Sequence, residues 1–140
     1  ILSGVTTSLF DKISMYGWVI AAFSILVGGF GIANIMFVSV KERTTIIGIQ
    51  KALGAKRYFI LIQFLFEAVM LCIFGGLIGL GLVFIISLLV NLSAGMQLIM
   101  TFKNIMIGIG ISTIIGILAG LIPSFLAARM DPIDAIRSNT

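Results

Sequence analysis

Three long apolar runs constrain the fold of this chain more than any other feature of its sequence. They cover Met15–Val40, Tyr58–Leu92 and Asn104–Ala128. The first, about 26 residues long, rises roughly 39 Å as a helix and so crosses the roughly 30 Å hydrocarbon core of a bilayer with tilt. The second is too long for one straight span, so we expect the span near Glu67–Leu92 and an interfacial lead-in at Tyr58–Phe66. The pattern predicts an all-α membrane protein with three transmembrane helices.

Composition excludes a soluble domain and most kinds of catalytic chemistry. Of the 140 residues, 60% are hydrophobic and 10% charged, whereas soluble domains are roughly 45–50% apolar and about 25% charged. The chain has no histidine, one cysteine and five scattered acids, so we expect no catalytic residue and no metal site. No phosphate-binding loop of the G-x-x-x-x-G-K-[ST] type occurs. We therefore expect neither an enzyme nor a cofactor in this chain, and no nucleic-acid partner, because its few charges lie in clusters between the apolar runs.

The distribution of lysine and arginine predicts the orientation in the membrane. The loop at 41–57 holds five of these residues, whereas the loop at 93–103 holds only Lys103. The positive-inside rule then places 41–57 and the tail at 129–140 in the cytoplasm, and residues 1–14 outside. No signal peptide precedes the first run, so this orientation requires an earlier helix upstream.

A short amphipathic helix is expected within the first loop. Ile46, Ile49 and Leu53 recur at helical spacing, with Ile47 beside them, and Gly54 stands where a helix C-cap is expected. A helix of about nine residues is too short to be stable alone. It must rest on the membrane surface or on a partner, and the residues leave both possibilities open.

The two ends of the chain carry weaker signals. Asp131 and Pro132 predict the start of a second short cytoplasmic helix that runs to about Ser138. Pro123 is expected to end or kink the third span. At the other end, the residues before the first span form either a plain anchor or a helix that continues outward as a stalk.

Small residues follow the apolar runs at helical spacing, and such stripes let helix backbones approach closely in lipid. In the third run they recur every four residues: Gly108, Ser112, Gly116, Gly120 and Ser124. The second and first runs hold shorter sets, Gly75 with Gly79 and Gly28 with Gly29. These residues serve packing within the bundle or against a second copy, and the sequence does not choose between the two.

Two polar side chains inside the runs are candidates for a role in the membrane, Asn34 and Glu67. An intramembrane carboxylate is a functional-site hypothesis by default. Glu67 lies near the predicted cytoplasmic boundary, where a structural role is favoured, either pairing with a basic residue or capping a helix. A proton or substrate role is the alternative.

Three blocks of sequence resemble a known family. Val27–Thr44 reads V-G-G-F-G-I-A-N-I-M-F-V-S-V-K-E-R-T, Ile47–Ala55 reads I-G-I-Q-K-A-L-G-A, and Pro123–Arg137 contains A-A-R-M-D-P-I-D-A-I-R. Together they resemble the FtsX-like permease domain of MacB-type ABC transporters. The likeness covers nearly the whole chain.

The resemblance implies a homodimeric permease of the bacterial inner membrane with four membrane helices per subunit, of which this chain holds the last three. The short helix of the first loop would dock on an ABC nucleotide-binding domain or subunit, which would carry the ATP and Mg. The implied ATPase-coupling residues are Glu42, Arg43, Thr44, Ile46, Ile49, Gln50, Lys51, Leu53 and Gly54. The resemblance also implies further partners: membrane lipid and, in some members, a periplasmic adaptor and an outer-membrane channel. Where the family has charged residues, this chain has Thr45, Ile46 and Gln50, so apolar contacts to the ATPase would replace charged ones.

Two functions fit this resemblance. The first is a permease that transmits ATPase motion to an extracytoplasmic domain and so exports or extracts a drug, peptide, lipid or lipoprotein. The alternative is an FtsX-like signalling protein that regulates an extracytoplasmic cell-wall hydrolase. The size and kind of the outer domain would discriminate between them.

Overall fold

The computed structural model describes residues 1–131, 133 and 137, and in these residues it contains helices and no strand. The helices are α1 (Leu2–Glu42), α2 (Thr44–Ala52), α3 (Arg57–Ala94) and α4 (Phe102–Arg129). Three of them, α1, α3 and α4, are long and apolar enough to cross a membrane. This confirms the all-α membrane fold with three spans.

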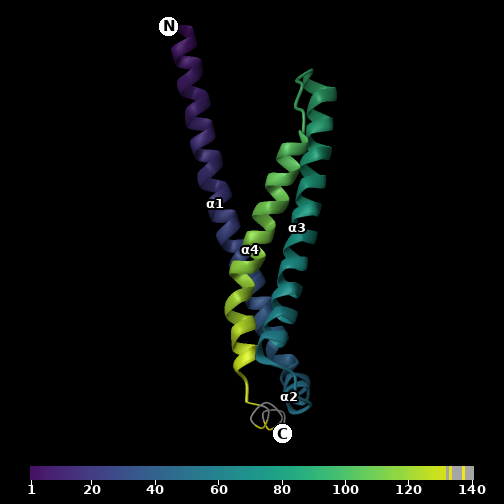
Figure 1. Ribbon diagram of the computed structural model, residues 1–140. Coiled ribbons are helices and arrows are strands. Elements are labelled where there is room, and N and C mark those ends of the chain that lie inside the picture. Colours follow the sequence, from purple (N-terminus) through teal and green to yellow (C-terminus); the bar gives the residue numbers. More distant parts are fainter. Residues whose placement is uncertain (132, 134–136, 138–140) are drawn as a thin grey trace.

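The helices α3 and α4 form a hairpin whose two arms lie in close contact along their length (Figure 1). The small-residue stripe of α4 lies at this contact. A Cβ atom added to Gly116 would lie 2.8 Å from the Cα atom of Val69, and one added to Gly120 would overlap the side chain of Ala68. Backbone proximity therefore sets the spacing of the hairpin.

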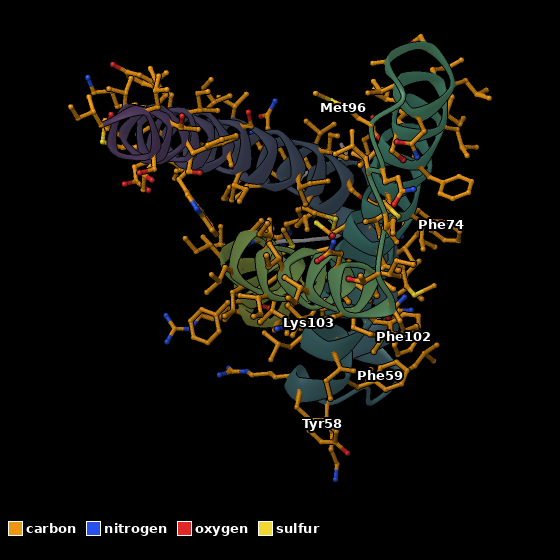
Figure 2. All side chains as sticks on the ribbon, turned by 90° about the horizontal axis from the view of Figure 1, so that it is seen from above. Tyr58, Phe59, Phe74, Met96, Phe102 and Lys103 are labelled. Atoms are coloured by element: carbon orange, nitrogen blue, oxygen red, sulfur yellow. The ribbon has the colours of Figure 1, made fainter. Side chains whose placement is uncertain are left out.

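The helix α1 crosses the hairpin at one end and diverges from it at the other. Figure 1 shows the N-terminus far from α3 and α4, and Figure 2, viewed from above, shows α1 leading away from both. Residues 1–28 are exposed throughout, and buried α1 side chains occur only at Met36 and Val40. The three long helices thus meet at the end that carries α2.

The core of the molecule lies at this α2 end. Its buried side chains come from all four helices: Met36, Val40, Ile47, Ile60, Phe64, Ala68 and Ala127. With lipid around the long helices there is no hydrophobic drive between spans, so close packing at this cluster holds the four elements together.

Three boundaries differ from, or refine, the sequence-based expectations. The helix α3 runs unbroken from Arg57, so the expected interfacial lead-in is part of the membrane helix itself. The helix α1 is continuous from Leu2, so the residues before the first span extend it. Pro123 was expected to end or kink the third span, and the first of these alternatives was wrong, because α4 continues to Arg129. Pro123 and the small residues after it are buried against the core, and this packing holds the last turns in place.

Most of the expected C-terminal helix lies outside the described residues. Ile133 and Arg137 are helical, and the Ile133 amide donates to the Asp131 carboxylate at 3.1 Å. This contact is of the kind expected where an aspartate precedes a helix.

Candidate coupling site at the α2 end of the bundle

The helix α2 follows α1 after a single non-helical residue. Arg43 has φ −99° and ψ 13° and serves as C-cap of α1 and N-cap of α2. The Thr44 hydroxyl donates to the carbonyls of Val40 and Lys41, at 3.1 and 2.7 Å. This elbow, at Arg43 and Thr44, is therefore short and held by its own hydrogen bonds, so the position of α1 determines the direction of α2.

The far end of α2 is closed by a glycine, as the sequence predicts. Gly54 adopts φ +99°, a conformation that side chains rarely tolerate. Its amide donates to the Lys51 carbonyl and the Ala55 amide donates to the Gln50 carbonyl, each at 3.0 Å. This pair of bonds is the Schellman arrangement, which stops α2 and turns the chain toward α3.

The two faces of α2 have different environments. Thr44, Ile47 and Gly48 are buried against the core. The apolar stripe recognised in the sequence faces the other way: Ile46, Ile49 and Leu53 are 55%, 47% and 84% exposed. A nine-residue helix thus has one apolar face inside the bundle and a second one uncovered, which marks a surface for a partner or for lipid.

An ion pair joins the elbow to α3. Arg43 Nη1 lies 2.9 Å from Glu67 Oε2, and Nη2 lies 3.3 Å from Oε1, so the guanidinium binds the carboxylate with both nitrogens. The two side chains are 45% and 32% exposed. Glu67 therefore has the structural role of pairing with a basic residue, and its partner comes from the residues implied in coupling.

A second tie joins α2 to the end of α4. The Lys51 ammonium donates hydrogen bonds to the carbonyls of Ala128 and Met130. These are among the carbonyls that a helix end leaves without partners, and a cation suits the negative end of the helix dipole. Burial lowers the pKa of Lys51, Arg57 lowers it further, and Asp131 partly opposes the shift.

The other implied coupling residues lie on the surface of the same end. Glu42 is exposed beside Arg43, and Gln50 is partly buried on α2. The described residues contain no group of three His, Cys, Asp or Glu side chains that could hold a metal ion.

The predicted packing residues divide into two groups. The residues of the first group lie on α4 and contact α3: Gly108, Ser112, Gly116 and Gly120. In the second group nothing lies within 4 Å of the position of an added Cβ atom: Gly28, Gly75 and Gly79. Gly29 has only a distant contact, with Ile115. The sequence reasoning missed Gly76, where a Cβ would overlap the Ser112 side chain. Its place beside Gly75 was visible, but spacing alone does not fix which side of α3 faces α4.

The intramembrane Asn34 lies exposed on α1, unlike Glu67. A polar amide directed at lipid is costly.

Comparison with known proteins identifies the family. The profile described as FtsX-like permease C-terminal matches residues 18–132, which include α2, α3, α4 and the greater part of α1. The chain belongs to this family. The FtsX-like match includes the elbow at Arg43, the exposed face of α2 and the Glu67 partner, so the site described above lies wholly inside the family domain.

Relatives of this FtsX-like domain are ABC transporter permeases. It is 47% identical over 118 residues to the uncharacterized ABC transporter permease YknZ of Bacillus subtilis, covering 84% of this chain and 30% of YknZ. It is 48% identical to the macrolide export ATP-binding/permease protein MacB of Agrobacterium fabrum, over 84% of this chain and 18% of that protein. The probable syringafactin export ATP-binding/permease protein SyfD of Pseudomonas syringae pv. tomato is 46% identical over the same shares. The FtsX-like chain thus spans less than a third of these relatives.

Proposed function

We propose that this domain is the membrane part of an ATP-driven ABC exporter and that α2 docks on the ATPase. The exposed apolar face of Ile46, Ile49 and Leu53 on a helix fixed to the bundle is the observation that supports this assignment most strongly. MacB and SyfD are named as ATP-binding/permease export proteins. ATP and Mg would then be bound by the partner ATPase, whether fused or separate.

The ties of α2 supply a route for motion. The elbow connects α2 to α1, the Arg43–Glu67 ion pair connects it to α3, and Lys51 connects it to α4. A displacement of α2 would therefore act on all three long helices at the end where they meet. Because α1 is one continuous helix, a movement at its base would be transmitted to its far end.

A domain that transmits motion, and does not conduct cargo, needs no polar path between its helices. The space between α1 and α4 is a groove of about 350 Å³ lined only by apolar residues and glycine: Ile25, Leu26, Gly29, Phe30, Ala33, Phe37, Ile115, Leu118, Ala119 and Ile122. Hydrophilic cargo would need polar groups along its route. The cargo class, a drug, peptide, lipid or lipoprotein, would be selected by parts outside this chain.

A second copy of the permease is the proposed neighbour of α1. Gly28 has open space at its Cβ position, and Gly31 and Asn34 are exposed on the same helix. Small residues permit close helix approach, and an amide needs a hydrogen-bond partner in lipid. These features support a homodimer. We place it in a bacterial cytoplasmic membrane, with the α2 end in the cytoplasm and the N-terminal end outside, by the distribution of lysine and arginine.

Export is favoured over regulation of a cell-wall hydrolase by the names of the relatives. The FtsX-like signalling role would use the same α2 contact and would differ in the outer domain. A periplasmic adaptor and an outer-membrane channel would be partners only of an exporter.

The test is a photo-crosslinking residue at position 49 of the full-length protein in its native membrane. We expect capture of an ABC ATPase, identified by mass spectrometry. The same residue at position 103, at the opposite end of the bundle, serves as the control and is expected to capture none. Capture of lipid alone from position 49 would refute the docking assignment.

The Ile49→Asp substitution tests the function of the same surface. A carboxylate on the apolar face should cost the ATPase contact about 2 kcal/mol or more, in the range of interface hot spots. We expect ATPase stimulation to fall at least tenfold while membrane insertion is unchanged. Lys41→Asp, which places the same charge on the end of α1, is the matched control. Full stimulation in the Ile49 variant would contradict the proposal.

A further inference from the structure

A polar pocket lies beside the coupling site, where the end of α2, the start of α3 and the end of α4 meet. Its volume is about 400 Å³, and its lining residues are Lys51, Ala55, Arg57, Arg129, Met130 and Asp131. Three of these residues are cationic and one is acidic. The pocket is thus a concentrated positive site at one end of two membrane helices.

The described residues compensate the positive charge of the pocket only in part. The Arg57 side chain forms no hydrogen bond or ion pair with the residues that the structure describes. Lys51 contacts two carbonyls, and burial followed by the charge of Arg57 lowers its pKa, while Asp131 raises it. A bound anion would relieve the repulsion between Lys51 and Arg57 that this shift reflects.

The start of α3 adds to the positive potential. Lys56 is the N-cap residue, its side chain makes no capping bond, and the first turn contains no acid. The first amides of a helix lack partners within it, and this end of the dipole is positive. Arg57 and the first turn of α3 therefore act in the same direction on an anion in the pocket.

The surroundings indicate an anion that carries an apolar body. Arg129 lies over the ring of Phe125, with 4.3 Å between its guanidinium carbon and the ring centroid, and this ring is exposed. Tyr58 and Phe59 are also exposed, and Figure 2 shows both projecting outward at the start of α3. Aromatic side chains of this kind lie at the headgroup level of a bilayer. Beyond them, the apolar surfaces of α3 and α4 extend into the span.

We propose that this pocket binds the phosphate of an anionic phospholipid headgroup, with Arg57 and Arg129 as principal contacts and the acyl chains along the exposed surface of α3 and α4. Basic pockets between membrane helices at a bilayer surface bind such headgroups. The site does not depend on the proposed ATPase contact, because its lining residues are separate from the exposed face of α2. The bound headgroup would lie beside Lys51, the residue that joins α2 to α4. The lipid composition of the membrane would then act directly on this contact.

Native mass spectrometry of the full-length protein tests the proposal. The protein is released from nanodiscs that contain equal amounts of phosphatidylglycerol and phosphatidylethanolamine, and the retained lipids are counted. We expect selective retention of phosphatidylglycerol, reduced about fivefold in Arg57→Gln, which corresponds to the ~1 kcal/mol per basic residue near a membrane surface. Arg129→Gln is the second variant, should the first fail to fold.

Lys41→Gln is the matched control, because Lys41 is an exposed cation at the same end that does not line the pocket. We expect it to retain phosphatidylglycerol like the wild type. An equal loss in this control would show attraction by overall charge and overturn the proposal. Undiminished retention in both pocket variants would also overturn it. So would displacement of the lipid by millimolar inorganic phosphate, which would assign the pocket to free phosphate.

Discussion

Gly116 determines how closely the arms of the hairpin can approach. A Cβ atom at this position would meet the backbone of α3 at Val69, and a backbone atom cannot be moved aside as a side chain can. Gly110, on the same helix, has nothing within 4 Å of its Cβ position. Two glycines six positions apart therefore differ in what they contribute, although both are apolar positions of one membrane helix.

Gly116→Ala should consequently destabilise the purified permease by about 1–3 kcal/mol, the usual cost of overpacking. Gly110→Ala is the matched control and should be neutral or slightly stabilising, since alanine is the better helix former. Equilibrium unfolding in mixed detergent micelles measures both. Equal stabilities for the two variants would contradict the close contact at Gly116, and Gly116→Leu should lose folding or assembly altogether.

At the scale of the elements, α2 is held by ionic and carbonyl contacts at both ends rather than by its own helical propensity. The Arg43–Glu67 pair fixes its start to α3, and Lys51 fixes its last turn to α4. Nine residues cannot sustain a helix alone in water. Its order therefore depends on its neighbours, as the proposed transmission of motion through α2 requires.

Glu67→Gln should raise amide hydrogen exchange in α2 severalfold. Its cost in global stability should stay below about 1 kcal/mol, because the Arg43 side chain is exposed and the Glu67 side chain is still about one-third exposed. The charge exchange Arg43→Glu with Glu67→Arg should restore most of the protection. Glu42→Gln removes an acid of the same elbow and should change little. If the exchanged pair remains as unprotected as the single variant, the ion pair is not what holds α2.

The sequence predicted the long helices and α2 well, because apolar run length and periodicity are local properties. It also placed the C-terminal glycine of α2 correctly, since a left-handed residue is needed there. It did not predict that Glu67 binds Arg43, which lies 24 positions earlier, or that Lys51 binds the carbonyls of α4. Those contacts depend on how separate helices cross. At Pro123 only the first of the two expected effects, an end of the helix, is excluded, because α4 continues to Arg129.

At the scale of the whole molecule, the packed end and the open end should behave differently. The four helices share one core near α2, whereas the first part of α1 stands apart from the hairpin (Figure 1). A rigid-body change of α1 about the packed end would alter distances at the far end and leave those at the base nearly constant. The architecture thus predicts where conformational change is concentrated.

Spin-label distances in the full-length transporter can measure this difference. The pair Lys12 and Lys103 spans α1 and α4 at the open end, and the pair Lys41 and Leu126 spans the same helices at the base; all four side chains are exposed. Addition of a non-hydrolysable ATP analogue should shift the first distance by several times more than the second. Unchanged distances in both pairs would show that α1 moves together with the hairpin, and equal changes in both would show a displacement of the whole of α1. Either result would contradict transmission by rotation of α1 about its base.

The free part of α1 has a mechanical consequence. Residues 1–28 are exposed, and at about 1.5 Å per residue they form an arm of roughly 42 Å beyond the packed base. A rotation of only ~5° about that base would carry the tip through about 4 Å. A lever of this kind increases stroke and reduces force in the same proportion. Residues at the open end of α1 would therefore travel farther, and with less force, than those at the packed base.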